Sequence, residues 1–219
     1  MKNPEVLACC LLLTLAGPAL ATPGNVTVHG AVPPITWPES WPGLLTLADL
    51  DGDGRVDVIA AHYFAVNIWR QLEGGQLTPL DMIPGVKGGV VTVADLDGDG
   101  VPSLLVVDSF GITGLEPVEP FLFGPAQQLA SSSMGSAVAL AGDLDGDGHP
   151  DVLTDEGGLT TWLGDGVGGL KPGLLATTVS SVRTQLGDLD LDGQLNLVAA
   201  SSEAVPLLGN GDEIGRAHV

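Results

Sequence analysis

The sequence predicts an all-β fold, and three observations support this class. One acidic segment occurs four times, at residues 48–59, 94–105, 142–153 and 187–198, with first aspartates spaced by 46, 48 and 45 residues. Short apolar runs between turn residues surround each copy, as is typical of strands. The chain has 32 Gly and 16 Pro and no sustained i, i+3, i+4 spacing of apolar residues, which predicts few helices.

Each repeat has the same order of elements. In the first, an apolar run at 44–47 precedes the acidic loop, a second run follows at 56–61, and a third at 66–69 leads into a Gly-rich turn at 73–75. This order predicts three strands and a fourth per unit. Four short strands repeated radially at this period predict a β-propeller with four blades of about 46 residues present. A stacked solenoid is the alternative.

The start of the chain predicts secretion. An apolar run at 6–17 ends before the small-x-small pattern at 19–21, so residues 1–21 are interpreted as a signal peptide. A run of this length is short for a bilayer, so a transmembrane helix is the less favoured interpretation. Cys9 and Cys10 lie inside this segment. The mature chain therefore has no cysteine and is expected outside the cell, at its surface or in the periplasm, with no membrane insertion after cleavage.

The charge of the chain restricts its partners. It has 27 Asp and Glu against 7 Lys and Arg, a formal net charge of -20. Binding to nucleic acids needs clustered cations that neutralise phosphates, so this class of partner is excluded.

The acidic loops predict metal sites. Numbered from the first aspartate, carboxylates stand at positions 1, 3, 5 and 9, Gly at position 6 permits a sharp turn, and the carbonyl of position 7 faces the same centre. Hard oxygen ligands in this number suit Ca²⁺, with Mg²⁺ second. A solvated acidic turn is disfavoured because uncompensated carboxylates repel one another. The expected ligands are Asp49, Asp51, Asp53, Arg55, Asp57, Asp95, Asp97, Asp99, Val101, Ser103, Asp143, Asp145, Asp147, His149, Asp151, Asp188, Asp190, Asp192, Gln194 and Asn196.

The four loops are not expected to be equal. An EF-hand is excluded because it needs a Glu at position 12 and flanking helices. Loops one and three hold four carboxylates and are expected to bind tightest, whereas loop two, with Ser103 at position 9, is expected to bind weakest. Loop four has Asn196 at position 9 and Leu191 where the others have Gly, which is expected to strain its turn. Up to four Ca²⁺ ions are predicted.

The pattern DxDGDGxxD followed by an apolar strand resembles the FG-GAP/VCBS repeat of integrin α-subunits and many secreted bacterial proteins. The resemblance extends over about residues 44–212, where 207–212 match the Gly-rich turn of the family. It implies a calcium-stabilised β-propeller, commonly seven-bladed, that acts in extracellular recognition or adhesion. Four units would then be part of a larger ring, with a small closed four-bladed ring as the alternative.

The resemblance also divides the chain. Residues 1–21 are the signal peptide, 22–43 a lead-in for which a ring-closing strand is one interpretation, and 44–212 the four repeats. Residues 213–219 leave the repeat and resemble the translation of a sequencing adapter. We interpret them as a non-native tail, with the reading frame running off its insert near Asp212.

Signals for catalysis are weak. The glycines at 164, 166 and 169 formally match a dinucleotide motif, but the residues that follow do not open a helix, so a hairpin turn is favoured. Trp69 and Trp162 occupy equivalent places and are expected in the core. We expect a secreted, non-enzymatic calcium-binding module that recognises an extracellular protein or glycan. The alternatives are the propeller of a larger secreted lyase or hydrolase, and a purely structural surface segment.

Overall fold

The computed structural model describes residues 45–62, 65–84, 86, 89–131, 138–155, 158–177, 183–189, 191, 193–200 and 204–207. Within these ranges every regular element is a strand, and every strand pairing is antiparallel. The predicted all-β class is therefore confirmed. The predicted signal peptide, lead-in and tail lie outside the described residues. No helix in the described part of the chain is long and apolar enough to cross a membrane.

The described strands form four main sheets and one small two-stranded sheet, and most neighbouring strands of the main sheets are consecutive in the chain. Sheet 1 contains β1 (Leu45–Ala48), β2 (Asp57–His62), β3 (Ala65–Gln71), β4 (Leu77–Pro79) and β5 (Ile83–Pro84). Sheet 2 contains β6 (Val90–Ala94), β7 (Ser103–Asp108), β8 (Gly111–Leu115) and β11 (Gln127–Ser131). A small hairpin, β9 (Pro117–Glu119) and β10 (Leu122–Phe123), separates β8 from β11.

The second half of the chain repeats this plan. Sheet 3 contains β12 (Ala139–Gly142), β13 (Asp151–Asp155), β14 (Leu159–Gly164) and β15 (Leu170–Thr177). Sheet 4 contains the described strands β16 (Arg183–Gly187), β17 (Asn196–Ala200) and β18 (Ala204–Leu207). The expectation of three strands and a fourth per unit thus holds in the first three sheets.

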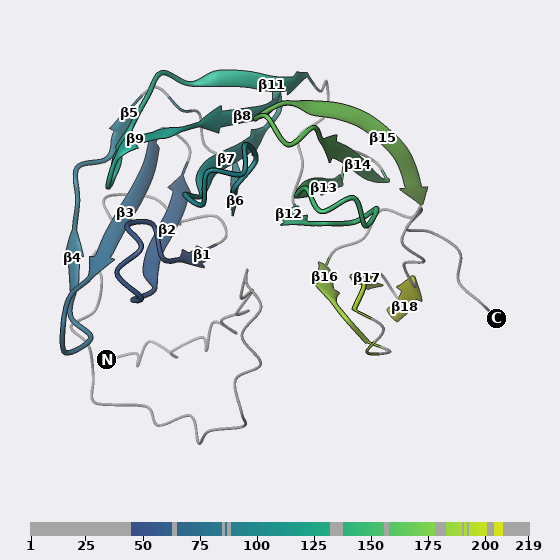
Figure 1. The fold of residues 1–219 in the computed structure, drawn as a ribbon, viewed down its shortest axis with the longest axis horizontal. Helices are drawn as coiled ribbons and strands as arrows, with labels where there is room; N and C mark the ends of the chain where they lie inside the picture. Colours follow the sequence, from purple (N-terminus) through teal and green to yellow (C-terminus); the bar gives the residue numbers. More distant parts are fainter. Residues whose placement is uncertain are drawn as a thin grey trace, which may run out of the picture.

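The sheets follow one another along an arc (Figure 1), with their first strands β1, β6, β12 and β16 on the inner side. These first strands contact one another from sheet to sheet. A side-chain contact reinforces the first junction, because the hydroxyl of Thr46 donates a hydrogen bond of 2.5 Å to the carbonyl of Val91. The arc has sheets 1 and 4 at its ends (Figure 1).

Apolar side chains fill the spaces between neighbouring sheets. Strand β7 shows why, since its side chains alternate between the two faces of sheet 2. Leu104 and Val106 pack toward sheet 1 with Ile59 and Ile68, whereas Leu105 and Val107 belong to the cluster shared with sheet 3. A third cluster lies between sheets 3 and 4. A strand buried on both faces reads as a continuous apolar run, as β7 does.

Candidate metal centre

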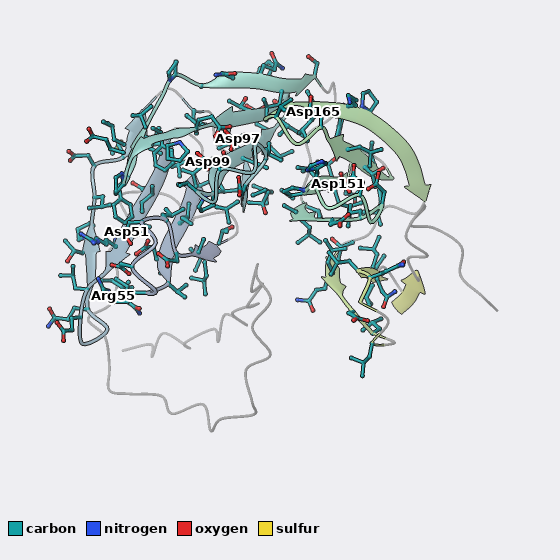
Figure 2. All side chains as sticks on the ribbon, in the orientation of Figure 1. Asp51, Arg55, Asp97, Asp99, Asp151 and Asp165 are labelled. Carbon is teal, nitrogen blue, oxygen red and sulfur yellow. The ribbon has the colours of Figure 1, made fainter. Side chains whose placement is uncertain are left out.

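All four acidic loops occupy the same place in their sheets. Each connects the first strand to the second, and position 9 is the first residue of the second strand. The register pairs this residue with the last one before the loop, as Ala48 with Asp57 and Gly142 with Asp151. Figure 2 shows labelled side chains of the first three loops on sheets 1 to 3. Strand pairing therefore holds both ends of these loops.

The turn of each loop depends on left-handed backbone at positions 4 and 6. Glycine occupies both places in the first three loops, for example Gly52 at φ 72° and Gly54 at φ 80°. In loop four, Gly193 stands at position 6 with φ 92°, but Leu191 stands at position 4 with φ 63°. A residue with a Cβ is strained in this conformation. The strain predicted for loop four is present.

The aspartate at position 1 holds the turn together. In loop one, its oxygens Oδ1 and Oδ2 accept N–H groups of Gly52 and Gly54, each at 2.8 Å. Loop three repeats both bonds from Asp143. The bond to position 6 recurs from Asp95 in loop two and Asp188 in loop four. These amide bonds orient the carboxylate within its own loop.

Acidic side chains of the first three loops converge. One carboxylate oxygen from each member lies within 4.8 Å of the others in three groups, and these groups are Asp49, Asp51 and Asp53, then Asp95, Asp97 and Asp99, then Asp143, Asp145 and Asp151. Asp147 lies beside the third group, and its Oδ1 accepts the N–H of His149. Asp190 and Asp192 of loop four lie outside the described residues.

The carboxylate at position 9 also joins the loop to the third strand. Oδ2 of Asp57 accepts the N–H of Leu50 at 3.1 Å, and Oδ1 accepts that of Gln71 at 2.8 Å. Asp151 makes the same two bonds to Leu144 and Gly164, both at 2.8 Å. The spacing of the acidic residues pointed to position 9 as a ligand and gave no sign of this second, structural contact.

Burial of position 9 changes its acidity. Desolvation raises the pKa of Asp57, although the N–H groups of Gln71 and Leu50 oppose the shift. Desolvation likewise raises the pKa of Asp151 to about 6, and the nearby Asp145 and Asp147 carboxylates add to it. Both side chains are almost fully buried. The protein therefore holds a carboxylate in an unfavourable place unless a positive charge lies nearby.

Loops two and four have a neutral residue at position 9, and it makes different hydrogen bonds from those of the aspartates. The hydroxyl of the fully buried Ser103 donates a hydrogen bond to Oε2 of Glu116, at the end of β8. In loop four, Oδ1 of Asn196 accepts the N–H of Leu189 at 2.6 Å. The Nδ2 of Asn196 is buried and has no hydrogen-bond partner among the described residues. The pattern of the loop does not indicate Glu116, because this residue lies 13 positions after Ser103.

Loop one alone of the first three has arginine against its carboxylates, among the residues that the structure describes. Arg55, at position 7, pairs with Oδ2 of Asp53. Arg70, on β3, lies 2.5 Å from Oδ2 of Asp51 and 3.2 Å from Oδ2 of Asp53. Burial would raise the pKa of Asp53, but the backbone N–H of Arg55 and the two guanidinium groups bring that pKa below its ordinary value. No feature of the loop pattern indicated Arg70.

The remaining residues singled out in the sequence have structural surroundings. Trp69 is 7% exposed, and it pairs with Val58 at the place where Trp162 pairs with Val152. The Nε1 of Trp162 donates to the hydroxyl of Thr154 at 3.1 Å. The glycines at 164, 166 and 169 belong to the β14–β15 hairpin, whose turn is closed by Asp165. The hairpin interpretation of this motif is confirmed.

Comparisons with known proteins agree with this architecture. The model of the FG-GAP-like repeat matches residues 49–106, which contain loops one and two. A lectin of Agrocybe aegerita, described by its specific recognition of non-reducing terminal N-acetylglucosamine, superposes with a TM-score of 0.63 at 21% identity over 80% of this chain. The V. cholerae biofilm matrix protein Bap1 gives a TM-score of 0.45 at 19% identity, over 78% of this chain and 27% of its own.

These matches cover only part of each protein, so they support the repeat and the fold alone. The chain spans 51% of the length of the lectin. A comparison with curated proteins found no match. The predicted resemblance is confirmed where the family model applies: residues 49–106 of this chain carry an FG-GAP-like repeat.

Proposed function

We propose that this protein is a secreted, calcium-binding β-propeller module that recognises an extracellular glycan or protein and is not an enzyme. The observation that carries the calcium part is the convergence of three carboxylate groups at equivalent places in three successive sheets. Convergence at one place is common on acidic surfaces. Its repetition, with the same amide bonds to position 1, supports the proposal that the loops share a common ligand.

The donor set fits Ca²⁺ in loops two and three. Carboxylate oxygens are hard ligands, and several of them converge without a nitrogen or sulfur donor in the same group. Positions 1, 3, 5 and 9 would hold the ion. When bound, it would supply positive charge that offsets the repulsion among these carboxylates and the burial of Asp151. The residues themselves orient the ligands through the loop amides.

The recognition part rests on the architecture. Loops and turns at one end of the sheets are held by strand pairs, and binding residues commonly lie on loops positioned in this way. The lectin with a similar fold recognises a terminal sugar, which makes a glycan the first ligand to test. We also propose that the four main sheets are part of a larger propeller ring.

Thermal unfolding of the full chain tests the calcium part. At a free Ca²⁺ concentration of about 100 times Kd, binding to the folded state adds about 2.7 kcal/mol per site. This predicts a rise in Tm over EDTA of roughly 5–10 °C for each occupied site in a chain of this size. Asp145→Asn should reduce the rise, whereas Asp81→Asn, which removes one exposed charge outside the loops, should preserve it. An equal Tm in Ca²⁺ and in EDTA would contradict calcium binding.

A glycan array tests the recognition part. The labelled full chain should retain a defined set of oligosaccharides in Ca²⁺ and lose them in EDTA. Retention unaffected by EDTA would separate recognition from calcium, and no retention on glycans or on extracellular matrix proteins would contradict the binding role.

A further inference from the structure

In sheets 1 to 3, one position at the end of the third strand lies opposite position 9, and its charge differs from loop to loop. The strand register pairs Val58 with Trp69, Leu104 with Leu115, and Val152 with Trp162. Continued by one residue, it places position 9 of loops one, two and three opposite three different residues, namely Arg70, Glu116 and Leu163. We call this the facing position. It carries a cation in sheet 1, an anion in sheet 2 and a neutral side chain in sheet 3.

In loop one, the facing position brings its charge onto the loop. Arg70 contacts Oδ2 of both Asp51 and Asp53. The side chain of Asp51 is only 4% exposed, so the pair is poorly screened by water. The ring of Phe121, in the turn between β9 and β10, lies 5.4 Å from the guanidinium carbon of Arg70 and holds it from another direction. Arg70 is therefore fixed beside the loop.

Together with the loop backbone, Arg55 and Arg70 provide a hydrogen-bond donor for every carboxylate oxygen at positions 1, 3 and 5 of loop one. Each oxygen at positions 1, 3 and 5 accepts an N–H group, either from the loop backbone or from Arg55 and Arg70. An ion that binds there must displace the guanidinium groups from Asp51 and Asp53. The cost of that displacement reduces the affinity for metal.

Loops two and three lack this competition. Their position 3 and position 5 aspartates accept backbone N–H groups at Oδ1, just as in loop one. No described residue donates to the Oδ2 of these residues, which are Asp97, Asp99, Asp145 and Asp147. These oxygens remain available for a cation. The loops thus share one backbone frame and differ at the oxygens that the facing position controls.

Loop two gains a charge from the same position. Its Ser103 cannot supply the fourth carboxylate, but Ser103 is hydrogen-bonded to Glu116, which is an anion. Three aspartates and Glu116 give loop two the same formal charge as the four aspartates of loop three. Loop one has four aspartates but also two arginines in contact with them.

We propose that the facing position sets the metal affinity of each loop, and this rests on the proposed calcium binding. Arg70 is a built-in counter-ion that makes loop one the weakest of the first three loops. Glu116 supplies the charge that Ser103 lacks and makes loop two comparable with loop three. The order differs from the one expected from aspartate counts, which placed loop one with loop three and put loop two last.

Calcium titration of the isotope-labelled full chain, followed by NMR, resolves the loops. The amides of Gly54, Gly100 and Gly148 each donate to position 1 of their own loop and report its occupancy. Gly100 and Gly148 should shift at Ca²⁺ concentrations roughly tenfold below those that shift Gly54. Arg70→Leu installs the residue that sheet 3 has at the facing position. It should lower the Ca²⁺ concentration at which the Gly54 amide shifts by about tenfold. Glu116→Gln should raise the Ca²⁺ concentration at which the Gly100 amide shifts by about tenfold.

Two controls separate a counter-ion from a merely structural residue. Lys171→Leu removes a positive charge from an exposed residue of β15 and should leave the Gly54 titration unchanged. In EDTA, Arg70→Leu should lower Tm because Asp51 loses its counter-ion, and saturating Ca²⁺ should restore it. A purely structural Arg70 would lower Tm equally in both conditions.

The outcomes distinguish the two proposals. If none of the three amides responds to Ca²⁺, the proposed calcium binding fails. If Gly100 and Gly148 respond but Gly54 responds equally early in the parent chain, calcium binding stands and the facing-position proposal is overturned. The parent titration alone decides this point, even where a variant does not fold. An unchanged Gly54 titration in folded Arg70→Leu would also overturn it.

Discussion

Replacing Leu191 by glycine should stabilise the protein, although it removes an apolar side chain. Leu191 stands at position 4 of loop four with φ 63°, where the other loops have glycine at φ 72°, 75° and 80°. Its side chain is 86% exposed, so little burial is lost. The substitution changes the backbone preference and leaves the packing almost unaltered.

The expected size follows from two opposing contributions. A residue with a Cβ pays roughly 1–2 kcal/mol in left-handed conformation. Glycine loses more conformational entropy on folding, which costs about 0.5–1 kcal/mol. The net gain should be about 0.5–1 kcal/mol, or a rise in Tm of roughly 1–4 °C. The reverse substitution Gly98→Leu should lose a comparable amount, because its new Cβ would meet no atom within 4 Å.

Urea unfolding of the three proteins in EDTA measures this effect. The midpoints should move in opposite directions with unchanged slopes, so that the shifts report stability and not a change in the unfolded chain. Amide hydrogen exchange in β16 and β17 locates the effect in sheet 4, as local opening would require. A lower midpoint for Leu191→Gly, or shifts of the same sign in both variants, would refute the argument from backbone conformation.

Two further predictions concern position 9. Asp151→Ala should cost about 2–4 kcal/mol, because the buried N–H groups of Leu144 and Gly164 both lose their acceptor; an unchanged urea midpoint would show that water replaces the carboxylate. Burial raises the pKa of Asp151 from 3.8 to about 6, so between these pH values the metal-free folded state keeps a proton that the unfolded chain has lost. Its contribution to stability is present near pH 4 and is lost as pH rises through 6. Urea midpoints of the parent in EDTA should fall over this range more steeply than those of Asp151→Asn, and parallel profiles would contradict the assignment.

Short-range chemistry allowed much of the fold and the site to be predicted from sequence. Runs of β-branched and apolar residues between Gly-rich turns predicted the strands, and β7 forms from such a run. Alternating aspartates with glycines at positions 4 and 6 predicted sharp turns that gather carboxylates, as Asp49, Asp51 and Asp53 show. Leu191 predicted strain because its neighbours in the pattern are glycines.

Side-chain contacts between neighbouring strands could not be predicted from the sequence in the same way. Arg70 lies 17 and 19 residues from the carboxylates that it meets, and only the pairing of β2 with β3 brings them together. The equivalent pairing of β7 with β8 in sheet 2 puts Glu116 against Ser103. A count of aspartates within each loop therefore missed a cation in loop one and an anion in loop two.

The sequence by itself determined the repeat, the strands and the local shape of each acidic loop, because these depend on residues within a few positions of one another. The tertiary structure alone decided which charges face the loops and how the carboxylate at position 9 is held. Electrostatic interactions act through space, and strand register sets which distant residues share that space. The first three loops, although similar in sequence, thus acquire different surroundings from the strands beside them.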